Sequence, residues 1–286
     1  MSLPFSRIST KPDIGNDGNS VDISIGTPMP TMGSEEAIAL GLIPGYASVN
    51  KYGRSTDVDS GVATDIWDGA NATLAQPIWL APTAARIHAI VSSSASDDGD
   101  PAGVGAQTVQ VYGLTDWDTA EVSESVTLNG VGAVNTVNAY VIIHRMKVTA
   151  FGATSVNVGI IKATAASDNT ITAQINAGQG QTQMAIYGVP SIQKALITQF
   201  YASVLKATSA VRADIALLAN PIPDVEETGF LVKHTLGLTT TGSSLALHTY
   251  IPCKKFDGPC IIKMQASGSA ANIDVDAGFD LVLVDN

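Results

Sequence analysis

Short alternating segments dominate the chain from residue 61 onward and constrain its fold more than any other feature. Apolar and polar residues alternate with a period of two, and Gly, Asn, Asp or Pro residues separate one run from the next. No window of helical period longer than about 10 residues intervenes. Regular short strands of this kind are typical of all-β domains built from two packed sheets. The pattern predicts an antiparallel β-sandwich with a jelly-roll-like arrangement.

The predicted strands follow one another at spacings of roughly 10 to 20 residues. They are Arg86–Val91, Thr108–Leu114, Ser123–Leu128, Tyr140–Val148, Asn157–Ala163, Thr170–Ile175, Gln183–Tyr187, Ala195–Val204, Ala210–Leu217, Phe230–Leu236, Leu245–Ile251, Cys260–Gln265 and Phe279–Val284. Asn129-Gly130 predicts a tight hairpin turn. The Pro-containing stretch near 220–225 is a weak candidate boundary, but we expect one body over residues 61–286.

Residues 1–60 differ from the rest and predict an extended N-terminal arm. Proline is frequent there, and apolar residues are scattered with neither structural period. One window, Gly33–Leu42, predicts a helical turn or two, with Ser34 as the cap and Gly41 at the end. An arm of this composition cannot bury enough surface by itself to offset its ordering entropy. We expect it to lie on a neighbouring subunit or to stay unattached.

Composition excludes several classes of partner. Charged residues make up only 14% of the chain, against roughly 25% in ordinary soluble domains, and the net charge is −11. Binding nucleic acid needs clustered Lys and Arg, whereas the densest basic cluster is Lys254-Lys255 with Lys263 nearby. The sequence predicts no nucleic-acid partner and no membrane partner, because no apolar run approaches the roughly 20 residues of a membrane span. The start of the chain also lacks the pattern of a signal peptide, so we expect folding in a cytoplasm.

No motif for catalysis or cofactor binding is present, and the sequence predicts a non-enzymatic protein with no cofactor. His88, His144, His234 and His248 each fall in a different predicted strand, as chance would place them. There is no Gly-x-Ser-x-Gly elbow, phosphate-binding Gly-rich loop or His-Glu-x-x-His helix.

Two groups of carboxylates are the weak metal candidates. Asp97, Asp98 and Asp100 surround Gly99, and close acids around a glycine can chelate calcium. Their spacing is not that of an EF-hand, so a solvated loop is the preferred interpretation. Asp57, Asp59 and Asp65 form a second, looser group.

Trp67, Trp79 and Trp117 lie near the predicted junction of arm and body and are candidate interface residues. Tryptophan is enriched in interfaces as a large rigid group with a polar handle. Carbohydrate stacking would use the same residues, and the alternative is that they close the ends of the sandwich.

Two cysteines, Cys253 and Cys260, flank a turn that contains Asp257-Gly258. Cross-strand neighbours there would allow a disulfide if the register is right, but two free thiols are expected in a reducing compartment.

About half of the chain, from Thr64 to Ser203, resembles virion structural proteins of tailed bacteriophages, especially marine ones. The resembling segments are Thr64–Gly69, Ile78-Trp79, Pro82–Ala84, Arg86–Ser94, Val109–Thr115 and Ile160–Ala165. The resemblance implies a β-sandwich body and oligomeric assembly within a virion, and it implies no catalytic residue.

The expected function is that of a capsid decoration or cement protein, assembled in the host cytoplasm and located in the virion. Its expected partners are the major capsid protein or other virion proteins, and copies of itself, for example in a trimer. A tail or neck component is the second hypothesis. A carbohydrate-binding module, built on the tryptophans and on Asp97, Asp98 and Asp100, is the third.

Overall fold

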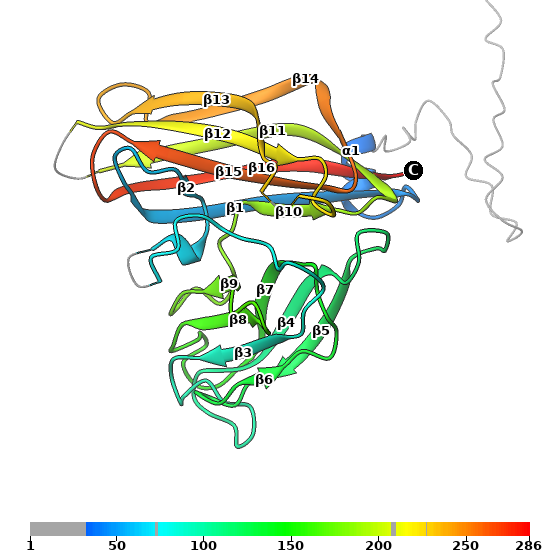
Figure 1. Cartoon of the computed structure of the whole chain (residues 1–286), viewed down its shortest axis with the longest axis vertical. Coiled ribbons are helices and arrows are strands. Elements are labelled where there is room, and N and C mark those ends of the chain that lie inside the picture. Colours follow the sequence, from blue (N-terminus) through cyan, green and yellow to red (C-terminus); the bar gives the residue numbers. More distant parts are fainter. Residues whose placement is uncertain (1–32, 72–73, 207–209, 227) are drawn as a thin grey trace, which may run out of the picture.

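A computed structural model describes residues 33–71, 74–206, 210–226 and 228–286. The described part is an all-β arrangement of several antiparallel sheets, as the alternation predicts. Two hydrophobic cores divide it into a two-sheet body and an inserted lobe. In Figure 1 the body lies above the lobe. The two-sheet body holds the strands before residue 67 and after residue 184, and the inserted lobe lies between them.

Two sheets enclose the core of the two-sheet body. One has the strand order β1-β16-β11-β14, and the other has the order β10-β15-β12-β13 with β2 paired to β15. The strands are β1 (Tyr46–Val58), β2 (Thr64–Asp65), β10 (Ile186–Val189), β11 (Gln193–Leu205), β12 (Arg212–Asn220), β13 (Leu231–Thr239), β14 (Leu245–Asp257), β15 (Cys260–Gly268) and β16 (Ile273–Asp285). Numbered 1 to 8 along the chain without β2, the two orders are 1-8-3-6 and 2-7-4-5.

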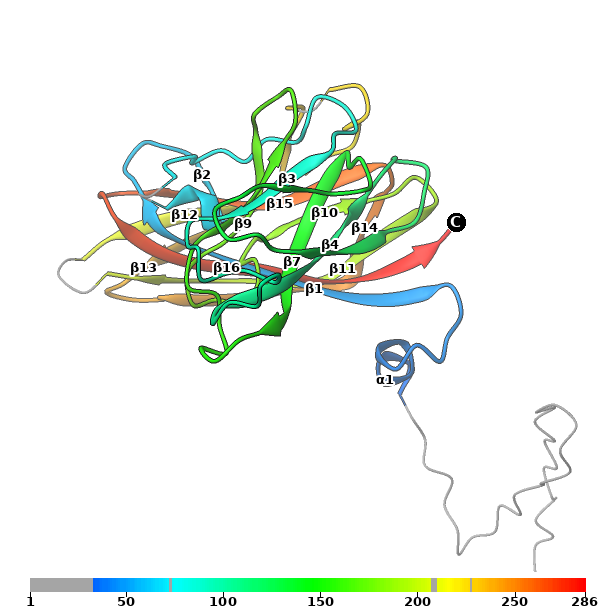
Figure 2. The same cartoon turned by 90° about the horizontal axis from the view of Figure 1, so that it is seen from below.

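The inserted lobe connects β2 to β10 and carries its own pair of small sheets. Their orders are β6-β3-β8-β9 and β5-β4-β7. The elements are η1 (Asp68–Ala70), β3 (His88–Ser92), β4 (Ala106–Leu114), β5 (Val122–Thr127), β6 (Val134–Asn135), β7 (Ile142–Phe151), β8 (Ile161–Ala165) and β9 (Ile171–Ile175). Ile186 of β10 and Ile261 of β15 belong to the core of the lobe, so the lobe packs directly on the two-sheet body. Figure 2, seen from below, shows the lobe in front of the body.

The boundary predicted at residue 60 is wrong, because β1 is part of the two-sheet body. Along its second half, β1 buries Lys51, Gly53, Ser55 and Val58 at alternating or nearly alternating positions. Three of these residues are polar or lack a side chain, so no hydrophobic period is visible in the sequence. Gly53 is needed for close approach, since a β-carbon there would lie 2.3 Å from the carbonyl oxygen of Ile66. The predicted arm between 1 and 32 lies outside the described residues.

Three local predictions have definite outcomes. The predicted helix exists as α1 (Ser34–Ala39), but its N-cap is Gly33 and not Ser34; Gly41 follows it with a φ of +68°. The weak boundary near 220–225 is wrong, because it falls between β12 and β13, which pair within one sheet. Asn129-Gly130 does turn, with Gly130 at a φ of +54°, but it joins strands of two different sheets and makes no hairpin.

Candidate functional site

Two of the three candidate interface tryptophans are core residues. Trp67 is fully buried and Trp79 is 1% exposed, and both belong to the core of the inserted lobe. Their ring N–H groups donate to the carbonyl oxygens of Gln76 and Thr172, respectively. The interface prediction is therefore wrong for Trp67 and Trp79, which fill a core instead. The residue type alone does not distinguish the two roles, because tryptophan is used both in cores and in interfaces.

Trp117 is half-buried at the junction between the inserted lobe and the two-sheet body. Its ring lies beside Gly188 of β10, and its carbonyl oxygen accepts a hydrogen bond of 2.7 Å from the backbone N–H of Ser191. The residue joins the two parts of the same chain at this point.

Asp97 is a structural residue and not a free metal ligand. Its carboxylate is fully buried and accepts four hydrogen bonds of 2.6–2.8 Å. The donors are Ser92 Oγ and the backbone N–H groups of Ala106, Val158 and Gly159. A carboxylate that accepts several such bonds holds three segments of the lobe together and has little capacity left for a cation.

The other acidic candidates do not join Asp97 in a cluster. Asp98 accepts a hydrogen bond from the backbone N–H of Asp100, which is exposed. Within the described residues, no three His, Cys, Asp or Glu side chains converge in a way that would hold a metal ion.

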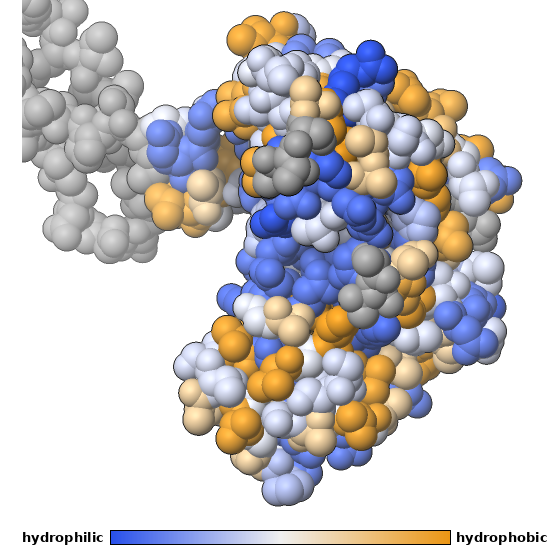
Figure 3. All heavy atoms as spheres, turned by 90° about the vertical axis from the view of Figure 1, so that its left-hand side faces the viewer, coloured by the Kyte–Doolittle hydropathy of each residue, from blue (hydrophilic) through white to orange (hydrophobic). Residues whose placement is uncertain are grey.

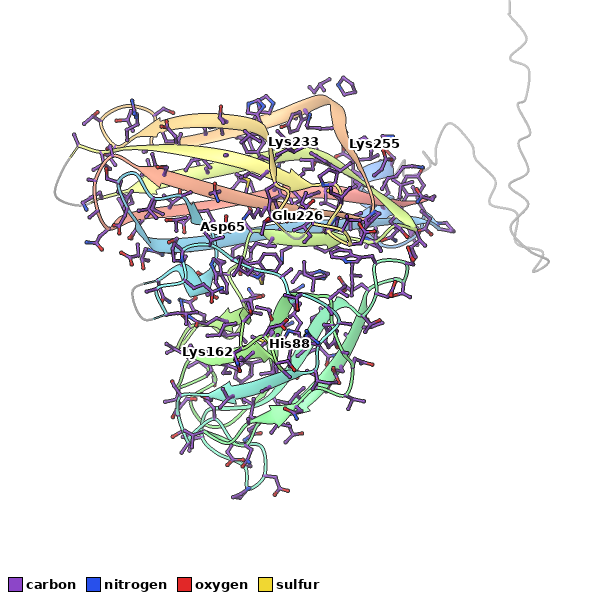
Figure 4. The ribbon with its side chains drawn as sticks, in the orientation of Figure 1. Asp65, His88, Lys162, Glu226, Lys233 and Lys255 are labelled. Carbon is purple, nitrogen blue, oxygen red and sulfur yellow. The ribbon has the colours of Figure 1, made fainter. Side chains whose placement is uncertain are left out.

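Asp65, from the second acidic group, lies on the side of the two-sheet body next to the inserted lobe (Figure 4) and forms a buried ion pair within the body. Its carboxylate lies 2.6 Å from the ammonium of Lys263 on β15, and both side chains are at most 3% exposed. It also accepts hydrogen bonds from Trp79 N and Gln265 Nε2. Burial raises the pKa of Asp65, and the ammonium of Lys263 opposes that rise. Asp59 instead accepts from the backbone N–H of Asn272, so the group does not assemble.

Cys253 and Cys260 are free thiols, which confirms the preferred prediction. Cys253 is exposed on β14 and Cys260 is buried at the start of β15. These strands belong to different sheets, so the two residues are not the cross-strand neighbours that a disulfide would require.

A polar cleft of about 400 Å³ opens where β1 meets the inserted lobe. Its lining includes Tyr52, Tyr112, Glu121, His144, Arg145 and Tyr187. Figure 3 shows hydrophilic residues gathered in the notch between body and lobe. Sequence reasoning missed this group because its members come from four separate strands and one loop.

Buried charges meet at the base of this cleft. The ammonium of Lys51 donates to the carbonyl oxygen of His144, and burial lowers the pKa of Lys51 to about 7. His144 Nε2 lies 2.5 Å from Glu121 Oε2, and its ring packs on Tyr187 with the ring centres 4.4 Å apart. Burial lowers the pKa of His144, and Glu121 opposes that shift. Perturbed groups in a cleft mark a candidate binding site.

The second candidate is an apolar surface on the side of the body away from the lobe, which we call the edge surface. It lies on β13 and β14, the last strands of their sheets. Its exposed aliphatic residues are Leu231, Val232, Leu245, Leu247 and Ile251, which are 53–91% exposed. Lys233 and Lys255 lie on the same side of the body (Figure 4), and the upper rim in Figure 3 carries hydrophobic residues interspersed with hydrophilic ones.

Aromatic and histidine rings line the inner side of the edge surface. The rings of His234 on β13 and His248 on β14 are 4.2 Å apart, and both contact Phe200 and Tyr250. Phe200 is fully buried, but His234, His248 and Tyr250 are only half-buried. The core of the two-sheet body is therefore incompletely covered along this side.

In comparisons with known proteins, no family model, curated protein or solved structure matches the chain significantly. Among the described residues, none of the helices has the length and apolar character needed to cross a membrane.

Proposed function

We propose that this chain is a non-enzymatic structural protein of a tailed-phage virion, a capsid decoration or cement protein whose two-sheet body is a jelly roll. The observation that carries the proposal is the strand order. Eight antiparallel strands in the orders 1-8-3-6 and 2-7-4-5 are wound as in a jelly roll, an architecture used by viral capsid proteins and also by lectins and cupins. The inserted lobe occupies the connection between the first and second of these strands.

The character of the surface supports a role in packing against other proteins. Charged residues are only 14% of the chain, and the exposed aliphatic residues of the edge surface lie together on two edge strands. Soluble monomers normally protect strand edges with charge, and large exposed apolar patches mark interaction sites. Buried apolar area contributes roughly 25 cal/mol per Å², and many copies on one particle add avidity.

The proposed arm is shorter than the sequence indicates. Since β1 begins at Tyr46, only residues before it are free to reach a neighbour without removing a strand from the body. Within residues 33–45, the side chains of Leu40 and Leu42 are 64% and 61% exposed, which suits contact with another subunit. Deletion of residues 1–32 is thus the informative truncation, whereas deletion of residues 1–55 would destroy β1.

Quantitative mass spectrometry of separated heads and tails tests the proposal. A shell protein is expected in the head fraction at hundreds of copies per particle, while about a dozen copies or fewer in the tail fraction would indicate a tail or neck component instead. The chain lacking residues 1–32 should remain folded by circular dichroism and should occupy particles less completely. Absence of the chain from purified particles would contradict the proposed function.

The polar cleft favours a second candidate function for this chain, that of a carbohydrate-binding module. Tyrosine rings beside hydrogen-bonding and charged groups are suited to sugars, and Arg145 already lies over the ring of Tyr112, 5.6 Å from its centre. A glycan array tests this candidate with the wild type and with Glu121→Gln and Arg145→Ala. Binding that both substitutions abolish would favour it, and an array without hits would remove it.

A further inference from the structure

Two lysines of the described residues are buried, and their charges are compensated differently. Lys263 is 3% exposed and lies 2.6 Å from the carboxylate of Asp65, which balances its charge. Lys51 is 7% exposed and lines the polar cleft, yet it forms no ion pair within the described part of the chain. Its ammonium donates to the carbonyl oxygen of His144. Because an ammonium has three N–H donors and an unpaired buried charge is costly, Lys51 is a cation that lacks an anion.

Arg145 adds a second cation without an acidic partner to the same cleft. Its guanidinium lies over the ring of Tyr112 and donates to Gln181 Oε1 at 3.4 Å, and it pairs with no acid among the residues that the structure describes. Composition does not force this, since the chain has 26 acidic residues and only 15 Lys and Arg. Burial first and the charge of Arg145 second lower the pKa of Lys51 to about 7, so the two cations lie close enough to repel each other.

The charge balance of the cleft fits one additional carboxylate. Among the described residues, Glu121 is the acid that lines the cleft, and its Oε2 lies 2.5 Å from His144 Nε2. When Lys51 is protonated, two cations and one carboxylate leave an excess of one positive charge. A single carboxylate balances that excess, and Arg145 is suited to hold it, because a guanidinium binds a carboxylate through two parallel hydrogen bonds.

We propose that the polar cleft binds an acidic sugar and holds its carboxylate between Lys51 and Arg145. The volume of about 400 Å³ lies within the range of small-ligand sites. Tyr52 and Tyr112 offer partly exposed rings to the body of the sugar. Gln181 of the lobe donates to the hydroxyl of Tyr52 on β1 and accepts from Arg145, so hydrogen bonds join body and lobe across the cleft. The proposal goes beyond the virion role and rests on the second candidate function, to which it adds the charge of the ligand.

Isothermal titration calorimetry of the full chain tests the proposal with D-glucuronate and D-galacturonate. D-glucose and D-galactose are their uncharged counterparts. At pH 6.5 we expect dissociation constants below about 1 mM for the acidic sugars and at least about tenfold weaker binding of the uncharged ones. Arg145→Gln and Lys51→Met should each weaken the binding of the acidic sugars at least about tenfold. Arg212→Gln should leave it unchanged, because Arg212 is exposed and lies outside the cleft.

Lys51 should also make this binding pH-dependent. A bound carboxylate favours the protonated ammonium, so binding by the wild type should be at least about fivefold tighter at pH 6.5 than at pH 8.5. The other groups around Lys51 do not titrate across this range. Arg145 stays charged, burial lowers the pKa of His144 and raises that of Tyr187, and burial acts to raise the pKa of Glu121 but His144 and the two cations lower it overall. Lys51→Met should therefore lose most of the pH response.

Several outcomes would overturn the proposal. They are the absence of saturable binding of both acidic sugars up to about 20 mM, equal binding of the uncharged sugars, and binding that neither Arg145→Gln nor Lys51→Met weakens. Inorganic phosphate that binds more tightly than either acidic sugar would also contradict a site for one carboxylate. Circular dichroism shows whether each variant is folded, and Arg145→Gln, at an exposed position, keeps the test decisive if Lys51→Met fails to fold. Equal binding of uncharged sugars would refute the acidic ligand without refuting carbohydrate binding, and the presence of the chain in particles is measured separately.

Discussion

At the residue scale, several buried charged groups stabilise contacts between separate segments. Asp97 accepts its four hydrogen bonds within the lobe, and Asp65 pairs with Lys263 between β2 and β15 of the body. Such groups look like functional acids in the sequence, because a carboxylate that binds a metal and one that binds backbone N–H groups are chemically the same. Only the number of donors around each oxygen distinguishes the two roles.

The Asp65–Lys263 pair should be costly to break. Lys263→Met leaves a buried carboxylate without its cation, and removal of one partner of such a pair costs about 3–5 kcal/mol. The double variant Asp65→Asn with Lys263→Met should recover most of that loss. Urea unfolding measures both, with Arg212→Met as the control, since Arg212 forms an exposed pair worth less than about 1 kcal/mol. Equal losses for Lys263→Met and Arg212→Met would contradict this interpretation of the pair.

Asp68 should give the protein a distinctive pH dependence of stability. Burial raises the pKa of Asp68 from its ordinary value of 3.8 to about 8, while the backbone N–H of Gln183 opposes the rise. Between these values the folded state binds this proton more tightly than the unfolded state does, so this group's contribution to stability falls as the pH rises, by up to about 1.4 kcal/mol per pH unit. Asp68→Asn should remove that contribution. Unfolding free energies of wild type and variant that keep a constant difference from pH 5 to pH 8 would disprove it.

At the element scale, most strands could be predicted, but β1 could not. Alternation of apolar residues identifies β4, β11, β12 and their neighbours, whose inward positions are mainly Val, Ile, Leu or Ala. The inward positions of β1 include Lys51, Gly53 and Ser55, which are buried because the lobe and the second sheet cover them. A hydrophobic pattern cannot show a strand whose burial comes from distant segments.

Neither the order of the strands in the sheets nor the exposure of the edge strands could be predicted from the sequence. Leu245, Leu247 and Ile251 recur at every second or fourth position, as in any half-buried strand, yet they lie on the exposed face. Period-two alternation distinguishes two faces without saying which one a neighbouring element covers. The cleft beside β1 could not be predicted either, because its residues come together only where the lobe packs on the body.

The His234–His248 pair should make binding through the edge surface pH-dependent. Burial lowers the pKa of His234, with further lowering from His248 and Lys254 on β14; Phe200 on β11 and Tyr250 on β14 complete its surroundings. Protonation puts a cation into an apolar contact, so the chain should occupy particles less completely at pH 5 than at pH 7.5. Mass spectrometry of particles incubated at both pH values, with His234→Gln as the comparison, measures this. A pH response that His234→Gln fully retains would assign it to other groups.

At the scale of the whole molecule, the two parts have complementary roles in the proposed function. The two-sheet body presents the edge surface on one side and supports the inserted lobe on the other (Figure 1). The shared residues Ile186 and Ile261, together with the hydrogen bond from the backbone N–H of Trp79 to Asp65, hold the lobe on the body. A two-part subunit of this kind can contact a neighbouring protein through one side while the lobe stays available for other contacts.

Electron cryomicroscopy of intact particles tests the central claim most directly, because it shows where the chain lies and which surface it buries. The account predicts two-lobed density repeated over the shell, with the β13–β14 side of each body against a neighbouring protein. Density for separate bodies whose β13–β14 sides face solvent, or a shell without such density, would contradict it.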